Sequence, residues 1–358
     1  MSLSCGLVGL PSCGKTVIFN AITAAGVSSY DGSEMNRAIV KLPDQRLEQL
    51  IKMYRPRKEV QANLEIVDIP GPEVGPQGNG RGSRLLGHIK DVEALLHVTR
   101  CFKYGADPLD DETVDPVRDI ETLDLELMVA DSVTLENKMD RLSKRVRGRD
   151  KGAIQESADC EKVHADLGRG IPARKQDLSA REMASIQECH LVSLKPVMYI
   201  ANVRSGDDAS NRHVAALRQF TNAENAEMII VYGKDEADIS QLEPSERGEF
   251  LQALGLEESS RDRLLQAAYR MLGVVNFFTT GEDEVRAWTC RKGDKAPVAA
   301  GKIHTDMEKG FIRMEVISYA DLMELGGEAA VAKAGRKRVE SREYEVQDGD
   351  IVVVLFND

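Results

Sequence analysis

The chain has 358 residues, of which 42% are hydrophobic and 30% are charged, and its formal net charge is -12. This length exceeds what one ordinary hydrophobic core can organise, so we expect two or three structural units in a soluble globular protein. No apolar run reaches the roughly 18 residues that a membrane-spanning helix needs, and the acidic balance argues against general coating of nucleic acid, although a local basic patch can still bind RNA.

Short apolar runs alternate with helical patterns through the first 255 residues. The runs with the pattern of buried strands are residues 7–8, 64–69, 94–102, 196–203 and 226–234. Because strands that alternate with helices form parallel sheets, this rhythm predicts an α/β domain in which helices wrap a parallel sheet.

A helical insertion interrupts this rhythm at about residues 125–190. Apolar residues recur there at three- and four-residue steps, at Leu127, Leu135, Met139, Leu142 and Val146. A second helical pattern follows residues 148–152, so the two segments predict a helical hairpin. Further along, Ser179 and Glu182 have the spacing of a capping box and predict the start of another helix.

The pattern changes from helical to alternating near Val274. The chain then ends in "VQDGDIVVVLFND", in which a turn at Asp348 and Gly349 leads into a final strand. We therefore predict two domains, residues 1–273 with the helical insertion and residues 274–358.

The N-terminus and the cysteines indicate a cytoplasmic protein. Met1 leads directly into a strand-like pattern, without the basic and apolar regions of a secretory signal. The six cysteines show no CxxC spacing, which argues against a zinc site and against a disulfide framework. We expect reduced thiols and no membrane association, and the sequence leaves the oligomeric state open, with a monomer favoured.

The segment "GLPSCGKT", residues 9–16, satisfies the pattern GxxxxGK[ST] between a strand and a helix. Such a loop binds phosphate through consecutive backbone N–H groups and the helix N-terminus. The residues expected to contact phosphate are Gly9, Pro11, Ser12, Cys13, Gly14, Lys15 and Thr16. Lys15 would reach the β- and γ-phosphates and the Thr16 hydroxyl would bind Mg²⁺, which predicts ATP or GTP as ligand with Mg²⁺ as cofactor.

A second motif follows the strand pattern "LEIVDIPG". Asp68 stands three residues before Gly71, which is the DxxG arrangement. Asp68 would hold the hydration shell of Mg²⁺, and the Gly71 N–H would contact the γ-phosphate so that the following glycine-rich segment senses hydrolysis.

With these motifs in place, the chain resembles the YchF/Obg-like ATPase family of P-loop NTPases over almost its whole length. The resemblance is carried further by "VDPVRDIETLDLELMVAD", "KPVMYIANV", "NFFTTGEDEVRAWT" and "VQDGDIVVVLFN". It implies a Ras-like P-loop NTPase domain with a helical coiled-coil insertion and a C-terminal α+β domain of the β-grasp (TGS) type. It also implies association with ribosomes or RNA and slow hydrolysis used as a switch.

The base-binding segment departs from the family pattern. The family carries NxxE, whereas this chain has Asn202 followed by Ser205, so the carboxylate that pairs with guanine is missing. By the resemblance, Asn202 and Val203 lie at the base. Because a serine cannot accept two hydrogen bonds from guanine, we expect ATP to bind at least as well as GTP. Asp207 or Asp208 could supply the carboxylate, although a solvated loop is the favoured interpretation of both.

The residues for hydrolysis also depart from the family pattern, and no catalytic residue is identified. Pro72 follows Gly71 where Ras-like enzymes carry a water-orienting glutamine. The family's histidine after "RCF" is absent, and Ser33 is a weak substitute for the threonine that closes on Mg²⁺. We therefore predict a slow nucleotide-dependent switch, with a non-hydrolysing scaffold and a P-loop small-molecule kinase as the alternatives.

Two further features have alternative interpretations. A basic run at the predicted tip of the hairpin could bind RNA or ribosome phosphates, or it could be a solvated helix face; its candidate residues are Lys144, Arg145, Arg147 and Arg149. Cys13 could be a redox-sensitive thiol with a pKa lowered by the helix N-terminus, but a small loop-filling residue is favoured.

Overall fold

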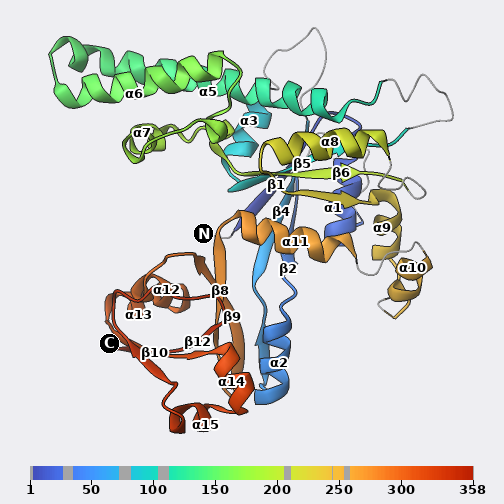
Figure 1. The fold of residues 1–358 in the computed structure, drawn as a ribbon, viewed down its shortest axis with the longest axis vertical. Coiled ribbons are helices and arrows are strands. Elements are labelled where there is room, and N and C mark those ends of the chain that lie inside the picture. The colour runs from blue at the N-terminus through green and yellow to red at the C-terminus, as the bar shows by residue number, and fades with distance from the viewer. Residues whose placement is uncertain are drawn as a thin grey trace. The chain divides into compact units, whose positions relative to one another are not determined.

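The computed structural model describes residues 3–26, 35–71, 82–103, 113–204, 211–243, 245–253 and 259–357. The chain forms two compact units (Figure 1). The first contains Met1–Val40 and Glu65–Leu264, and the second contains Lys41–Leu64 and Leu265–Asp358. Among the described residues, no helix combines the length and the hydropathy that a bilayer crossing requires.

The first unit is built on a six-stranded sheet with the strand order β2-β4-β1-β5-β6-β7. These strands are β2 (Asn36–Lys41), β4 (Asn63–Asp68), β1 (Ser4–Val8), β5 (Ala94–Arg100), β6 (Val197–Asn202) and β7 (Met228–Val231). From β4 to β7 all neighbours pair in parallel, and all five residues of β1 are buried. The predicted parallel α/β sheet is confirmed.

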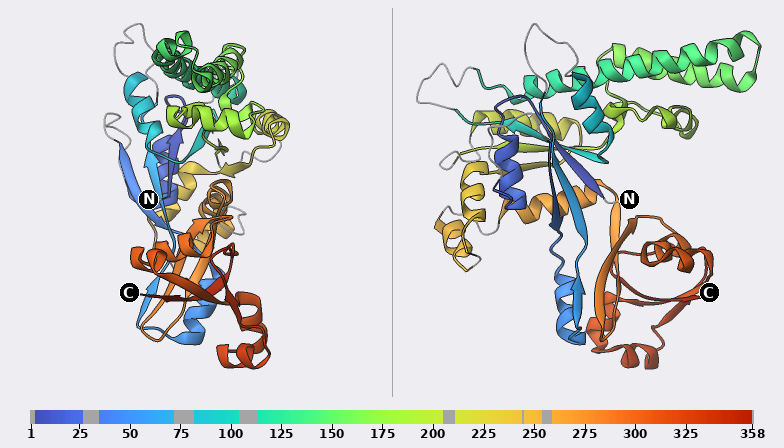
Figure 2. Two further views of the ribbon diagram at one scale, coloured as in Figure 1. Left: turned by 90° about the vertical axis from the view of Figure 1, so that its left-hand side faces the viewer. Right: turned by 180° about the vertical axis from the view of Figure 1, so that it is seen from behind.

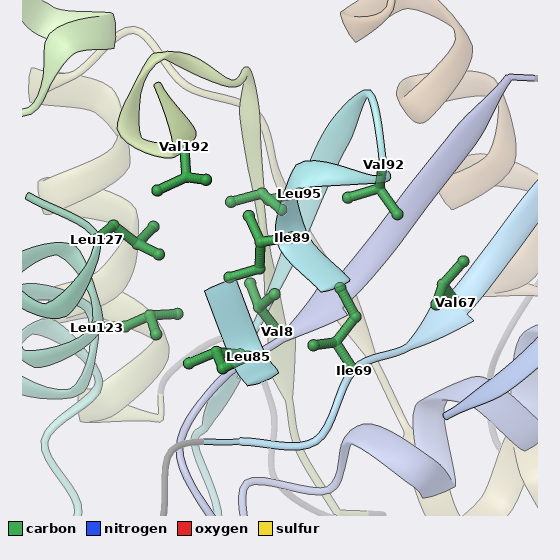
Figure 3. Packing of buried hydrophobic residues seen from close by; sticks show 10 residues of the cluster. All are labelled: Val8, Val67, Ile69, Leu85, Ile89, Val92, Leu95, Leu123, Leu127 and Val192. Carbon is green, nitrogen blue, oxygen red and sulfur yellow. The ribbon is translucent and has the colours of Figure 1, made fainter. Parts of the chain in front are cut away.

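The helices of this unit are α1 (Lys15–Thr23), α3 (Gly82–Lys90), α8 (Arg212–Ala223), α9 (Gly233–Ser240) and α10 (Arg247–Ala253), and α11 (Ser260–Met271) continues from it into the second unit. All of them except α10 carry buried side chains. Figure 3 shows one core cluster, in which Leu85 and Ile89 of α3 lie between the sheet and two leucines of the next long helix, Leu123 and Leu127. This packing fixes α3 against the base of the helical insertion.

The insertion is a long helical hairpin, which we call the arm. It consists of α5 (Pro116–Arg147) and α6 (Lys151–Gly168), and both helices extend away from the sheet (Figures 1 and 2). Helix α5 begins well before the expected residue 125, because its first turns carry Ile120 and Leu123 into the core of the sheet domain. Asp115 caps α5 by accepting from the Arg118 N–H, and Pro116 occupies the first turn, where a missing N–H costs nothing.

Short helices return the chain from the arm to the sheet. These are η1 (Ala173–Lys175), α7 (Ala180–Ile186), η2 (Gln187–Cys189) and η3 (Val192–Leu194). The predicted capping box is confirmed, since Ser179 and Glu182 each bond the other's backbone N–H. The buried carboxylate of Asp131 in α5 accepts from the N–H groups of Val192 and Ser193, both at 2.8 Å. The arm is therefore tied to this return segment by hydrogen bonds as well as by apolar packing.

The second unit contains a mixed six-stranded sheet with the order β11-β10-β12-β8-β9-β3. Its strands are β11 (Arg338–Glu340), β10 (Phe311–Ser318), β12 (Asp350–Phe356), β8 (Val274–Thr279), β9 (Glu284–Arg291) and β3 (Lys58–Val60). Its helices are α2 (Gln45–Tyr54), α12 (Ala296–Ile303), α13 (Thr305–Lys309), α14 (Tyr319–Leu325) and α15 (Glu328–Lys333). Phe277, Met314 and Val352 of the sheet pack with Ala299 and Ala300 of α12 in a buried core.

The division of the chain differs from the sequence-based boundary between residues 273 and 274. Residues 41–64, which that boundary assigned to the first domain, belong to the second unit. The physical reason is strand pairing and charge: β3 pairs in parallel with β9, and Arg46 of α2 bonds Asp348 at 2.7 Å and lies 5.4 Å from the centre of the Phe278 ring. Local periodicity carries no information about such long-range pairing.

Candidate functional site

The loop between β1 and α1 has a backbone that only glycine can adopt at two positions. Gly9 has φ 150° and Gly14, the residue before α1, has φ 96°. A Cβ on Gly9 would lie 2.4 Å from the Val98 carbonyl oxygen, and one on Gly14 would lie 2.1 Å from Asn202 Nδ2. The spacing of the two glycines is therefore a requirement of close packing as well as of conformation.

Lys15 folds back over this loop. Its Nζ donates to the Gly9 carbonyl oxygen at 2.9 Å and to the Leu10 carbonyl oxygen at 3.1 Å. Pro11 and Ser12 are exposed at the turn, where Ser12 has φ 63°. The ammonium group is thus held against the backbone of the loop.

Thr16 and Asp68, which the sequence analysis assigned to Mg²⁺ binding, lie next to each other. The Thr16 hydroxyl donates to Asp68 Oδ2 at 2.9 Å, and the Asp68 carboxylate is buried. Asn36 at the start of β2 donates from Nδ2 to the same oxygen at 3.5 Å, a contact that the sequence analysis missed because nothing local marks it. The oxygens of Thr16 and Asp68 fit Mg²⁺, which prefers one or two protein oxygens together with water and phosphate.

The glycine of the DxxG motif, Gly71, also lies against the loop. A Cβ on Gly71 would lie 2.8 Å from the Gly9 carbonyl oxygen and 3.0 Å from Lys15 Nζ. The end of β4 therefore borders the phosphate loop. The predictions made for Ser33, Pro72, Ser205, Asp207 and Asp208 concern positions outside the described residues.

Asn202 makes a contact that the sequence did not indicate. Its side-chain Nδ2 donates to the Cys13 carbonyl oxygen at 2.9 Å, which ties the end of β6 to the phosphate loop. Gly233 at the start of α9 leaves room for this side chain, because a Cβ there would lie 2.6 Å from Asn202 Oδ1. The Val203 side chain, by contrast, lies in the core cluster with Val214 and Leu217.

The Cys13 side chain lies inside the loop and is 3% exposed. Burial raises the pKa of its thiol, and the nearby positive charge of Lys15 offsets this only in part. A thiol with a raised pKa is a poor nucleophile, so the structure favours the loop-filling interpretation over the redox interpretation.

A buried polar network lies where the arm meets the sheet. Arg174 of η1 pairs with Asp124 of α5 at 2.5 Å and reaches the Tyr199 hydroxyl of β6, which donates to Glu224 at 3.0 Å. His97 of β5 packs against Tyr199, and its Nε2 has no hydrogen-bond partner among the described residues. Burial lowers the pKa of His97 to about 4, so the imidazole is neutral at pH 7.

The basic tip of the arm is exposed in the structure. Lys144, Arg147 and Arg149 are all exposed, and Arg149 has φ 61° in the turn between the helices. Arg145 instead bonds Asp150 through Nε at 3.0 Å and Nη2 at 2.8 Å, and Asp150 caps α6. The four predicted residues therefore share one end of the arm, but Arg145 already has a structural partner.

The strand, the glycine-dependent loop, Lys15, and the Thr16 and Asp68 pair define an α/β domain of the P-loop NTPase class. A family model described as the C-terminal part of YchF GTPases, a protein of unknown function, matches residues 274–357, and one described as a 50S ribosome-binding GTPase matches residues 4–138. The chain belongs to the YchF family, as the resemblance predicted.

The relatives match along their full length. Ribosome-binding ATPase YchF of Bacillus subtilis (strain 168) is 42% identical over 365 residues, and that of Escherichia coli O157:H7 is 41% identical over 362 residues, each with 100% of both chains covered. Among solved structures, the Schizosaccharomyces pombe YchF GTPase is 33% identical with a TM-score of 0.88, covering 99% of this chain and 98% of that chain.

Proposed function

We propose that this chain binds a nucleoside triphosphate and Mg²⁺ in the loop of residues 9–16 and acts as a slow, nucleotide-dependent switch on the ribosome. The observation that carries the proposal is the loop itself, in which two glycines permit a backbone curve that other residues would block. Consecutive N–H groups in such a curve, next to a helix N-terminus, bind phosphate oxygens.

Each residue of the site has a distinct part in this proposal. Lys15 exchanges its two carbonyl partners for β- and γ-phosphate oxygens, and Thr16 and Asp68 hold Mg²⁺ and its water shell. Bound Mg²⁺ neutralises charge that develops on the phosphates. The Gly71 N–H contacts the γ-phosphate, and Asn202 holds the loop in shape through the Cys13 carbonyl.

Hydrolysis is expected to be slow, and ATP is expected to bind at least as well as GTP. Pro72 has no side-chain group that could orient water, and Ser205 replaces the carboxylate that would select guanine. The names of the two bacterial relatives, both ribosome-binding ATPases, support this nucleotide preference.

The ribosome is the proposed partner for two reasons. Both bacterial relatives carry the name ribosome-binding ATPase, and the chain offers an exposed basic arm tip on an otherwise acidic protein. We include in the proposal that the second unit is a TGS module, which would give the chain a second RNA contact. Phosphate contacts by Lys144, Arg147 and Arg149 would make the association sensitive to salt.

Calorimetric titration with MgATP and MgGTP tests the nucleotide site. Lys15→Ala should weaken ATP binding at least about tenfold, because it removes charge-assisted contacts to phosphate. Lys52→Ala, which removes the same charge from an exposed position on α2, should leave binding unchanged. Equal ATP affinity in the wild type and the Lys15 variant would refute the site, and a strong preference for GTP would refute the predicted selectivity.

A single-turnover assay tests the switch. Slow release of phosphate from bound ATP, faster in the presence of purified ribosomes, is the expected result. Tight ATP binding with no product over hours would identify a non-hydrolysing scaffold instead.

A further inference from the structure

The first half of α5 carries large apolar side chains on its solvent-exposed face. Leu125, Val129 and Val133 are 57%, 56% and 52% exposed, whereas Leu127 and Leu135 of the same helix are buried. The three exposed residues recur every four positions, so they lie on successive turns and form one strip about 12 Å long. We call Leu125, Val129 and Val133 the apolar ridge.

Neither packing nor helix formation accounts for the apolar ridge. Single exposed apolar side chains are common on protein surfaces, but three on successive turns of one helix form a continuous strip. Valine loses side-chain freedom in a helix, and alanine, glutamate and lysine are better helix formers at exposed positions. A strip of this kind is typical of a surface that binds a partner.

The charge around the apolar ridge is negative. From residue 119 to residue 137 the chain contains aspartate and glutamate but no lysine, arginine or histidine. Glu121, Glu126 and Glu136 of this stretch are exposed, and Glu136 also contacts His164 of α6 at 3.1 Å. Glu121 stands one turn before the ridge and Glu136 one turn after it, so carboxylates lie at both ends of the apolar strip.

This charge argues against several occupants. Carboxylates repel the phosphates of RNA and of an anionic membrane surface. A second copy of the chain is also disfavoured, because antiparallel pairing along the ridge would bring Glu121 of one copy near Glu136 of the other. Parallel pairing would place each glutamate beside its equivalent. The ridge therefore favours a partner that carries positive charge beside apolar side chains.

The backbone of α5 favours a helical partner over an extended one. The N–H and C=O groups of a helix interior are bonded within the helix, so this surface offers no strand edge to an extended peptide. A partner helix satisfies its own backbone and can place apolar side chains at three- and four-residue steps against the ridge. Lysines or arginines on its flanks would then meet Glu121, Glu126 and Glu136.

We propose that the apolar ridge and the three glutamates beside it bind a basic amphipathic helix of a ribosomal protein. The inference rests on the proposed association with the ribosome. It assigns a protein contact to the base of the arm, apart from the basic residues at the tip, so that the two ends of α5 bind partners of opposite chemistry.

Site-specific photocrosslinking of the full-length protein to purified ribosomes identifies the occupant. With benzoylphenylalanine in place of Val129, the expected product is an adduct that resists ribonuclease and contains a ribosomal protein. Mass spectrometry should place the crosslink in a segment rich in lysine and arginine with apolar residues at helical spacing. An adduct with ribosomal RNA, with a second copy of this chain or with an acidic segment would overturn the proposal, as would the absence of any adduct.

Cosedimentation with ribosomes measures what the ridge contributes. Leu125→Gln with Val129→Gln and Val133→Gln should bind at least about tenfold more weakly, because the apolar contact is lost. Glutamine is a good helix former, so urea unfolding of this variant should match the wild type. Val129→Ile, which keeps the apolar surface, should bind like the wild type. Val298→Gln, at an exposed valine of the second unit, should bind within twofold of the wild type.

A charge variant tests the flanks of the ridge. Glu121→Lys with Glu126→Lys should weaken ribosome binding at least about threefold, because a cationic partner would meet like charge. Tighter binding by this variant would show that phosphate faces the surface, and the proposal would be wrong. MgATP affinity should be unchanged in every variant.

The outcomes separate this inference from the proposed function. If the triple glutamine variant binds ribosomes like the wild type while Arg147→Glu with Arg149→Glu is weakened, the ridge has no partner on the ribosome and the proposed function stands. A wild type that does not bind ribosomes would overturn both proposals.

Discussion

The phosphate loop and the arm, both in the first unit, are specified in opposite ways. The loop depends on its backbone: Gly9 and Gly14 have positive φ, and a single added carbon at either would collide with a neighbouring atom. The arm depends on side chains: a repeated apolar pattern packs α5 against α6, and many of the polar residues on its outer surface are exposed. A substitution that adds a Cβ to the loop therefore disturbs the backbone itself, whereas a substitution on the arm surface changes only an exposed side chain.

Gly14→Ala should produce the largest effect. The new Cβ would meet Asn202 Nδ2 at 2.1 Å in a backbone conformation with φ 96°. We expect ATP affinity to fall at least about 100-fold and the free energy of unfolding to fall by roughly 2–3 kcal/mol. Calorimetry and urea unfolding measure the two effects.

Gly87→Ala is the control, because Gly87 lies in α3 with nothing within 4 Å of an added Cβ. It should raise the free energy of unfolding by about 0.5–1 kcal/mol. Similar losses of ATP affinity and of the free energy of unfolding in both glycine variants would show that the loop does not require glycine at position 14.

Asp131→Asn tests a buried hydrogen-bonded anchor of the arm. The Asp131 carboxylate accepts from two backbone N–H groups, and an amide side chain offers only one acceptor oxygen in place of two. The free energy of unfolding at pH 7 should fall by about 1–3 kcal/mol. Asp140→Asn, at an exposed position on the same helix, should change it by less than about 0.5 kcal/mol, and equal values for the two variants would contradict the anchoring role.

His97 lies where the sheet meets the arm, and it should make the free energy of unfolding depend on pH. Burial lowers its pKa from 6.5 to about 4 in the folded protein, with Asp124 acting against this and Arg174 and Lys15 adding to it. A lowered pKa of this kind stabilises the fold above the unfolded pKa, and that stability is lost as the pH falls toward the folded pKa. Acidification from pH 7 to pH 5 should therefore lower the free energy of unfolding by about 1–2 kcal/mol through this group.

Urea unfolding at both pH values measures the contribution of His97. His97→Leu should show a smaller loss of stability on acidification than the wild type. His164→Gln, which changes a partly exposed histidine on α6, should match the wild type more closely than His97→Leu does. Identical pH dependence in the His97 variant would show that its imidazole is not responsible.

Charge reversal at the tip should have the smallest effect on the fold. Arg147→Glu with Arg149→Glu should change the free energy of unfolding by less than about 0.5 kcal/mol, because both residues are exposed. Cosedimentation with ribosomes should nevertheless weaken and lose part of its salt dependence. Unchanged cosedimentation would assign these arginines to the solvated surface.

The features that the sequence predicted are those with local causes. The phosphate loop could be predicted because the spacing of Gly9, Gly14 and Lys15 reflects constraints within eight residues of chain. The arm could be predicted because apolar residues at three- and four-residue steps indicate a helix with one buried face. The start of α5 was missed because Ile120 and Leu123 pack into the core of the sheet domain. Periodicity does not distinguish residues that pack against the sheet from residues that pack within the arm.

The features that the sequence did not predict depend on distant partners. Asn202 is 189 residues from Cys13, and Asp124 is 50 residues from Arg174, so neither contact leaves a local pattern. Asn36 likewise meets Asp68 only through the pairing of neighbouring strands. Such contacts are set by topology, and local patterns in the sequence do not reveal which strands pair.

The second unit is assembled from two separate stretches of chain, Lys41–Leu64 and Leu265–Asp358. A gene fragment that starts near residue 265 would therefore encode a sheet without its β3 edge and without the α2 helix that bonds Asp348. The second unit therefore cannot be removed or exchanged as one continuous segment of the chain. Exchange of this unit would require changes at two places in the polypeptide.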